Sequence, residues 1–299
     1  MNWPPQRILV ATDFSDVAGA AVRAAAALAR RTGAALDLVH VLPDRPDALT
    51  GFEALDALLL RGVVDPEKLR AQAHAALEAV ARRLAPVEAK LHVVRGQPAA
   101  EILALRELLR VDLVALGGSG LRGLRRFVLG SVADRVLRRP GCPLLLVNHA
   151  PPNGELKTGV VAQEYPDRST PWLELALKVA HDERGELVVL HVLPQRGYAS
   201  DAHHVDLEPE RAPEKLERLI HDLDGTVPVR IETSRGDAAQ RIVEGTLKEG
   251  ADLLVIGAER NRDGWPGRVT DRVARAGLPA LLVVWPDAEA DEEFEGRDA

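Results

Sequence analysis

The chain has 299 residues, of which 38 are basic and 45 acidic, so its formal net charge at pH 7 is −7. This length predicts two domains of about 150 residues, and the net negative charge argues against a general nucleic-acid binder. The single cysteine excludes an intramolecular disulfide. With no signal-peptide pattern and no apolar run of ~18 residues, we expect a cytoplasmic protein that does not span a membrane.

Short apolar runs alternate with helical patterns along the first half, which is typical of a parallel sheet covered by helices on both faces. Ser15 resembles the N-cap of a helix that ends at Gly33, Pro98 lies in the first turn of another helix, and Gly130 begins the last one. We expect strands near residues 7–12, 35–42, 87–94, 112–116 and 143–147.

The second half repeats the first. RILVATD matches TGVVAQE, LDLVHVLP matches LVVLHVLP, and VDLVALG matches ADLLVIG. In the second half, Pro171 opens a helix and Gly185 is expected to stop it. The repeat predicts one domain over 1–150 and another over 155–286. The acidic, aperiodic tail over 287–299 is expected to be disordered.

A spaced glycine motif follows the fourth apolar run, in the stretch LVALGGSGLRGLRRFVLGSVADRV. Gly117 and Gly120 allow a close approach of the backbone to a ligand, and Gly130 and Ser131 open a helix whose free N–H groups can hold an anion. The motif therefore predicts a phosphate cradle. A GxGxxG match at 118–123 carries little weight because it follows the fourth strand and no acidic residue stands at a strand end ~20 positions on. The chain has no GxxxxGK[ST] loop.

The glycine spacing, together with ILVATDFSD, LDLVHVL and VLGSVADRVLRRPGCPLLLV, resembles the universal stress protein family over nearly the whole chain. The resemblance implies an α/β fold of two tandem doubly wound domains. Each would be a five-stranded parallel sheet in the order 3-2-1-4-5, with helices on both faces. In the family the apolar fifth strands pair across a dimer, so the two halves are expected to form an internal pseudo-dimer, and a homodimer of chains is also open.

The resemblance further implies that the first domain binds an adenine nucleotide, ATP, with Mg²⁺ as a candidate accompanying ion. Asp13 is assigned to the adenosine part and could also meet the metal ion; its plainer interpretation is a cap of the first helix together with Ser15. The backbone of Val41 would contact the adenine edge. His40 beside it is interpreted as a buried histidine satisfied at the end of the sheet rather than a catalytic one.

The same resemblance places Gly117 and Gly120 beneath the ribose and phosphates. Gly130, Ser131 and Val132 would present N–H groups and one hydroxyl to the phosphate chain. Val132 stands where many family members carry a second hydroxyl residue, so one phosphate contact would come from its backbone alone.

Other polar groups have two interpretations. Arg122, Arg125 and Arg126 could neutralise phosphates or could simply belong to an arginine-rich surface loop. The pair His203–His204 has no companion pair elsewhere, and a structural metal site needs about four ligands, which favours a solvated loop over a metal site. The helix-like segment over 50–64, which the second half lacks, could cover the nucleotide or extend the core.

The second half has lost the motif. Arg268 stands at the position of Ser131, Arg260 at that of Gly120, and Glu164 at that of Asp13. A side chain therefore occupies the position where backbone must approach phosphate. We expect no ATP binding in this half, which would serve as the partner fold; the less favoured alternative is that Arg260 or Arg268 reaches a different anion.

Three functions remain open from the sequence. The leading one is a universal stress protein whose ATP binding is coupled to a partner or to assembly in a stress response. A slow ATPase or phosphotransferase is less favoured, since no positioned base, nucleophile pair or metal cluster is found beyond Asp13. The third is an interaction protein that works without nucleotide.

Overall fold

The computed structural model describes residues 3–43, 65–118, 129–139, 141–150, 153–164, 170–193, 211–223, 226–258 and 265–286. The chain divides into two compact units, Asn2–Glu155 and Leu156–Ala299. The expected disordered tail over 287–299 and the helix-like segment over 50–64 lie outside the described residues.

The first unit alternates strands and helices throughout. Its elements are β1 (Arg7–Ala11), α1 (Asp16–Thr32), β2 (Ala35–Leu42), α3 (Pro66–Arg82), β3 (Ala89–Arg95), α4 (Pro98–Leu109), β4 (Leu113–Gly117), α5 (Ser131–Leu137) and β5 (Leu144–Val147). The strands are parallel and follow the order β3-β2-β1-β4-β5. The expected order 3-2-1-4-5 is therefore confirmed.

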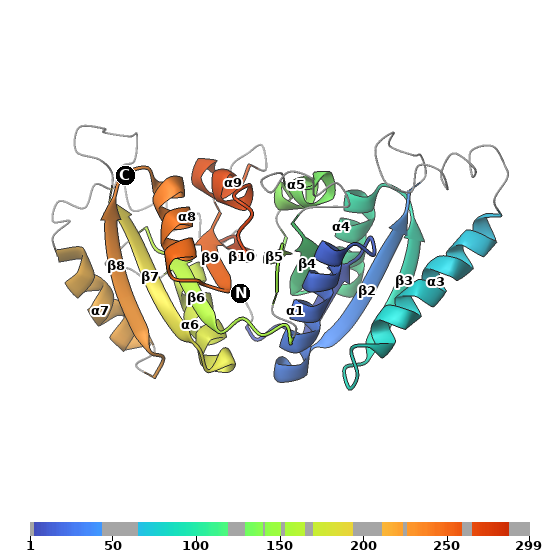
Figure 1. Cartoon of the computed structure of the whole chain (residues 1–299), viewed down its shortest axis with the longest axis horizontal. Helices are drawn as coiled ribbons and strands as arrows, with labels where there is room; N and C mark the ends of the chain where they lie inside the picture. Colours follow the sequence, from blue (N-terminus) through green and yellow to red (C-terminus); the bar gives the residue numbers. More distant parts are fainter. Residues whose placement is uncertain are drawn as a thin grey trace. The chain divides into compact units, whose positions relative to one another are not determined.

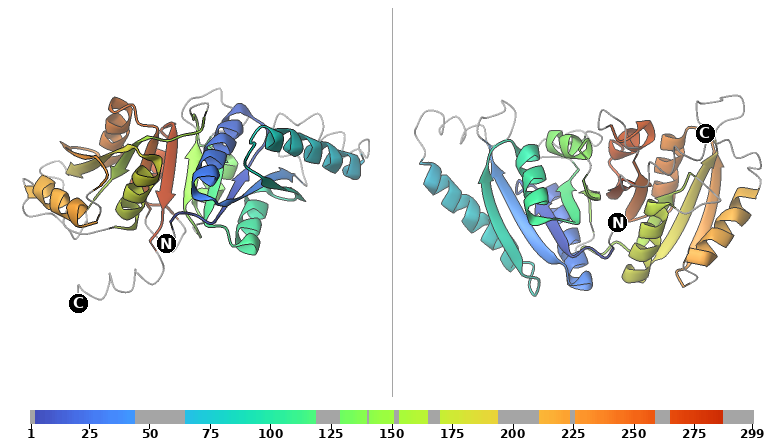
Figure 2. Two further views of the ribbon diagram at one scale, coloured as in Figure 1. Left: turned by 90° about the horizontal axis from the view of Figure 1, so that it is seen from below. Right: turned by 180° about the vertical axis from the view of Figure 1, so that it is seen from behind.

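Helices cover both faces of this sheet. Figures 1 and 2 show α1 and α3 on one face and α4 and α5 on the other. The chain moves from β1 outward to β3 through α1 and α3, then returns past β1 to β4 through α4. Because strand–helix–strand crossovers are right-handed, this reversal of direction puts the later helices on the opposite face.

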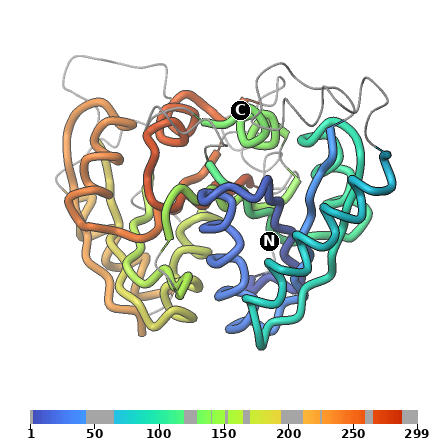
Figure 3. The backbone as a smooth tube through the Cα atoms, turned by 45° about the vertical axis from the view of Figure 1, so that its right-hand side comes forward, coloured from blue at the N-terminus to red at the C-terminus, as the bar shows by residue number. Residues whose placement is uncertain are grey.

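The second unit repeats the arrangement. Its elements are β6 (Thr158–Ala162), α6 (Pro171–Glu183), β7 (Glu186–Leu193), α7 (Ala212–Leu223), β8 (Val229–Arg235), α8 (Ala238–Lys248), β9 (Leu253–Gly257), α9 (Arg268–Ala274) and β10 (Ala280–Val284). Its parallel strands run in the order β10-β9-β6-β7-β8. Figure 3 follows this path by colour, from the yellow-green of β6 to the red of β10.

The duplication extends to single contacts. Asp112, just before β4, accepts hydrogen bonds at Oδ2 from the backbone N–H groups of Gln6 and Arg7, both at 2.9 Å. Asp252, just before β9, accepts from two N–H groups at the start of β6, both at 3.1 Å. In each unit this aspartate ties the beginning of the first strand to the beginning of the fourth.

Helix α1 buries more residues than any other described helix of the first unit. The side chain of Ser15 accepts from the N–H of Ala18, and Gly33 ends the helix at a φ of 73°, so both expected boundaries are confirmed. Between them lies an alanine-rich stretch whose small side chains let the helix approach the sheet closely. Its buried residues are Ala18, Ala20, Ala21, Val22, Ala24, Ala25, Ala26, Ala27, Leu28 and Ala29.

The end of α6 differs slightly from the expectation. The helix ends at Glu183, two residues before Gly185, and Arg184 takes the left-handed conformation with a φ of 50°. Gly185 follows at once, and a Cβ there would lie 2.0 Å from the carbonyl oxygen of Lys157. The glycine is required by close packing rather than by its φ. Within the described part of the chain, no helix has the length and apolarity of a membrane span.

Candidate functional site

The carboxyl ends of β1 and β4 form the switch point of the first sheet. β1 pairs with β2 on one side and with β4 on the other. The chain leaves β1 for α1 on one face and leaves β4 toward α5 on the other face (Figure 1). Open α/β sheets bind ligands in the crevice that such a divergence creates.

The loop between β1 and α1 is held by its own polar side chains. Oδ1 of Asp13 accepts from the N–H of Ser15 at 3.0 Å, and Oγ of Ser15 accepts from the N–H of Ala18 at 3.2 Å. Phe14 has a φ of 64°, the left-handed region that a bulky residue rarely adopts. The hydrogen bond from Ser15 thus supports the interpretation that Asp13 helps to cap the first helix. Among the described residues, its Oδ2 accepts no hydrogen bond.

His40 supports this loop from β2. Its Nδ1 lies 2.8 Å from the carbonyl oxygen of Thr12, and its ring centroid lies 4.5 Å from that of Phe14. Burial lowers the pKa of His40, opposed by the Thr12 hydrogen bond and the charge of Asp13. The imidazole is therefore neutral near pH 7, with Nδ1–H donating, as the structural interpretation of His40 expected. Val41 follows it, half-buried near the end of β2.

A hydrogen bond between two glycines joins the end of β4 to the start of α5. The N–H of Gly130 donates to the carbonyl oxygen of Gly118 at 2.8 Å, which joins the start of α5 to the end of β4. A Cβ on Gly117 would lie 3.1 Å from the backbone nitrogen of Ala18 and 3.2 Å from Cγ1 of Val17. A side chain at position 117 would therefore be tight against α1, so packing within the fold, as well as the approach of a ligand, favours glycine there.

The first turn of α5 has no side-chain cap. Gly130 is the N-cap, with φ −64° and ψ 149°, and among the described residues no side chain accepts from the turn that follows. Ser131 is exposed and Val132 half-buried. By contrast, Ser15 and Asp65 cap α1 and α3 with their own oxygens. The N–H groups at the start of a helix lack intrahelical acceptors, so here they stay available to another acceptor.

Part of the expected site lies outside the described residues. Gly120 and the arginines Arg122, Arg125 and Arg126 fall within 119–128, and the pair His203–His204 falls within 194–210. Of the residues that the structure does describe, no group of three or more His, Cys, Asp or Glu side chains could hold a metal ion.

The second unit has a different arrangement at the equivalent edge. Gly267, the N-cap of α9, has a φ of 86°, and Arg268 follows it as an exposed side chain. Oγ1 of Thr270 donates to the carbonyl oxygen of Gly257 at 2.7 Å. Glu164 is exposed. The hydroxyl of Thr270 thus joins helix α9 to the end of β9, and the first unit has no such contact among its described residues.

Sequence reasoning missed Trp172, the second residue of α6. A Cβ on Gly257 would lie 2.5 to 2.7 Å from its ring atoms Cε3, Cδ2 and Cζ3. The sequence does contain a signal for it: Trp172 directly follows Pro171, which opens the helix, and it takes the position that Val17 has in α1. This signal was not used because the glycines were interpreted only as approaches to a ligand.

Comparison with known proteins agrees with this architecture. A family model described as the universal stress protein family matches residues 5–148 and 157–284. The universal stress protein MJ0531 of Methanocaldococcus jannaschii is 32% identical over 144 residues, which cover 48% of this chain and 81% of that protein. A universal stress protein of Thermus aquaticus, named for the QAH/OAS sulfhydrylase 3′ region, is 36% identical over 140 residues, covering 47% and 96%.

Among solved structures, a universal stress protein from Archaeoglobus fulgidus matches with a TM-score of 0.67 and 18% identity, covering 95% of this chain and 99% of that one. This likeness supports the fold. Both halves of the sequence match the family model, and together the matches cover nearly the whole chain. The chain belongs to the universal stress protein family and carries two tandem domains of it.

Proposed function

We propose that the first domain binds ATP at the switch point between β1 and β4, and that the second domain is its pseudo-dimer partner. The observation that carries the proposal is the uncapped first turn of α5 at the carboxyl edge of the sheet. Backbone N–H groups at a helix start favour an anion, and a phosphate chain supplies one.

The surrounding groups suit the rest of a nucleotide. Oδ2 of Asp13 is open among the described residues, so the carboxylate can accept from ribose hydroxyls or meet a phosphate-bound Mg²⁺ without losing its contact with Ser15. Val41 offers its backbone near the end of β2 to the adenine edge. Gly117 and Gly120 would lie beneath the ribose and phosphates, and Ser131 adds one hydroxyl.

Equilibrium dialysis with ATP and Mg²⁺ tests the proposal, with the expected result of one nucleotide per chain. Ser131→Arg copies Arg268 of the second domain at an exposed position, so it should weaken ATP binding at least about tenfold, or ~1.4 kcal/mol, without loss of folding. Gly120→Arg, which copies Arg260, should act in the same direction. Unchanged affinity in both variants would contradict the proposal.

Two controls sharpen the result. Arg268→Ser makes the reverse change in the second domain and should leave the stoichiometry at one. Asp13→Asn removes the charge but keeps a side-chain oxygen that can accept from Ser15. If this variant binds ATP more weakly, the loss comes from a contact with the ligand and not from a lost cap. Sedimentation with and without ATP then tests whether binding changes assembly, and a chain that binds no nucleotide would favour the nucleotide-independent interaction protein.

A further inference from the structure

We propose that Trp172 closes the switch point of the second domain, so that this domain is filled by its own side chains where the first domain binds a ligand. The inference rests on the proposed function for the ligand of the first domain. The filling itself rests on contacts within the second domain alone.

The indole of Trp172 spans the two elements that flank the crevice. It belongs to the first turn of α6, the helix that follows β6, and its ring lies directly on Gly257 at the end of β9. Because β6 and β9 are neighbours in the sheet, the contact crosses the switch point from one side to the other. The position corresponds to the place where open α/β sheets receive ligands.

The first domain has a much smaller side chain at the same place. Val17 is the second residue of α1, as Trp172 is of α6, and its Cγ1 approaches the Cβ position of Gly117 to 3.2 Å. A bicyclic indole therefore replaces an isopropyl group between equivalent elements. The indole of Trp172 is larger than the side chain of Val17, so it occupies space at this edge that the first domain leaves open or fills with other groups.

Two hydrogen bonds engage polar groups at this edge of the second domain. The hydroxyl of Thr170 donates to Oε1 of Gln163 at 2.8 Å, and both residues are buried. Thr270 donates to the carbonyl oxygen of Gly257, whereas the equivalent residue in the first domain, Ala133, has no hydroxyl. The edge thus offers fewer free groups to a ligand.

Shape rather than hydrogen bonding holds the indole. Nε1 of Trp172 is buried and has no hydrogen-bond partner in the described part of the chain. An indole N–H in that state is unfavourable, so the packing of the ring against Gly257 must outweigh the cost. Trp172 as a whole is half-buried, and the contacts that carry the proposal are those of its ring with Gly257.

The first test transfers the tryptophan to the first domain of the full chain. Val17→Trp should weaken ATP binding at least 100-fold in equilibrium dialysis with Mg²⁺, while the matched control Val17→Ile should stay within threefold of the wild type. Circular dichroism and the thermal midpoint establish folding, and Val17→Phe replaces Val17→Trp if that variant does not fold. Wild-type affinity in the folded aromatic variant would overturn the proposal.

The second test does not depend on ATP. Trp172→Val should open a cavity that takes up free indole, measured as one saturable equivalent per chain and as a rise in thermal midpoint. The wild type and the control Trp265→Val, at an exposed tryptophan, should take up none. Absence of indole binding by Trp172→Val would overturn the proposal. If the wild type binds no ATP, the proposed function fails while this test still decides whether Trp172 fills the crevice.

Discussion

The carboxylate of Asp37 and the imidazole of His92 lie 2.7 Å apart, from Oδ1 to Nε2, and the carboxylate is fully buried while the imidazole is 22% exposed. The guanidinium of Arg7 approaches the other oxygen, with its Nε 3.5 Å from Oδ2. β2 thus buries a charged group between partners supplied by its two neighbouring strands. In the second domain Val188 stands at the position of Asp37, so the fold does not need the charge.

His92→Ala should destabilise the first domain by about 2–4 kcal/mol, because it leaves the buried carboxylate of Asp37 with only Arg7 beside it. Asp37→Val, which copies Val188, should change stability by less than about 1 kcal/mol, since the partially exposed His92 and Arg7 can be hydrated instead. Urea unfolding followed by a probe in the first domain measures both effects.

The double variant supplies the control for this pair. Adding Asp37→Val to His92→Ala should recover most of the stability that His92→Ala loses, because no buried charge remains to be compensated. If Asp37→Val alone proves as damaging as His92→Ala, the carboxylate itself is required and the argument from charge burial is wrong.

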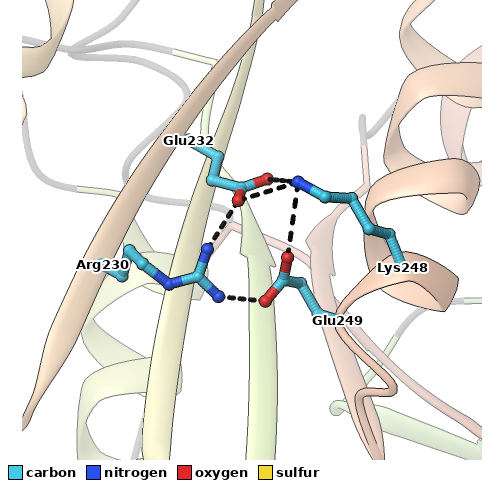
Figure 4. A network of polar contacts seen from close by, with 4 residues as sticks. All are labelled: Arg230, Glu232, Lys248 and Glu249. Carbon is cyan, nitrogen blue, oxygen red and sulfur yellow. Dashed lines mark hydrogen bonds and ion pairs between the residues drawn. The ribbon is translucent and has the colours of Figure 1, made fainter.

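Arg230, Glu232, Lys248 and Glu249 form a network of ion pairs between β8 and the end of α8 (Figure 4). Arg230 and Lys248 are well exposed, at 55% and 68%. Exposed ion pairs are screened by water and salt. Lys248→Ala should therefore lower the thermal midpoint by no more than about 2 °C in dilute buffer. The difference should vanish in 1 M salt, and a larger, salt-independent loss would contradict this view.

The fold was predictable from the sequence because its signals are local. Apolar runs marked the strands, and Ser15 and Pro171 marked helix starts: the Ser15 hydroxyl caps α1, and Pro171 is the first residue of α6. Boundaries failed where tertiary contacts decide them. The third strand was expected from residue 87 but begins at Ala89, since the N–H of Val87 donates instead to the carbonyl oxygen of Leu84 in a turn.

The candidate site was predictable only in part. The edge that gathers Asp13, Val41, Gly117 and Gly130 follows from the strand order, which the resemblance to the family implied and the spacing of the motif alone does not give. The contacts of Trp172 and Asp37 depend on which residues face each other across elements far apart in the chain, and a single sequence does not encode that directly. The ligand roles of the site residues remain predictions.

Cys142 should be an unreactive thiol. Burial raises its pKa from 9.0 to about 11, and the nearby charge of Arg106 offsets only part of that rise. Because the thiolate is the nucleophile, alkylation by iodoacetamide at pH 8 should be about 100-fold slower in the native protein than in urea. Arg106→Gln removes the charge that favours the thiolate, so it should not speed the reaction in a folded protein. Equal rates in the native and unfolded chain would refute the prediction.

His40 should report the charge of Asp13. Burial holds the pKa of His40 below its ordinary value of 6.5, and the Thr12 hydrogen bond and Asp13 charge act against that effect. Asp13→Asn should therefore lower the pKa of His40 further in an NMR titration of the imidazole. A pKa that rises in this variant would contradict the assignment.

The same shift predicts a pH dependence of stability. Because the folded pKa of His40 is depressed, the unfolded chain takes up the proton first as the pH falls. The stabilisation associated with neutral His40 is thus fully present above pH 6.5 and is lost progressively below it. His40→Gln should flatten this part of the stability profile in urea unfolding between pH 5 and 7. The control is His74→Gln, at an exposed position of α3. In this variant the stability should still fall between pH 7 and pH 5 as it does in the wild type.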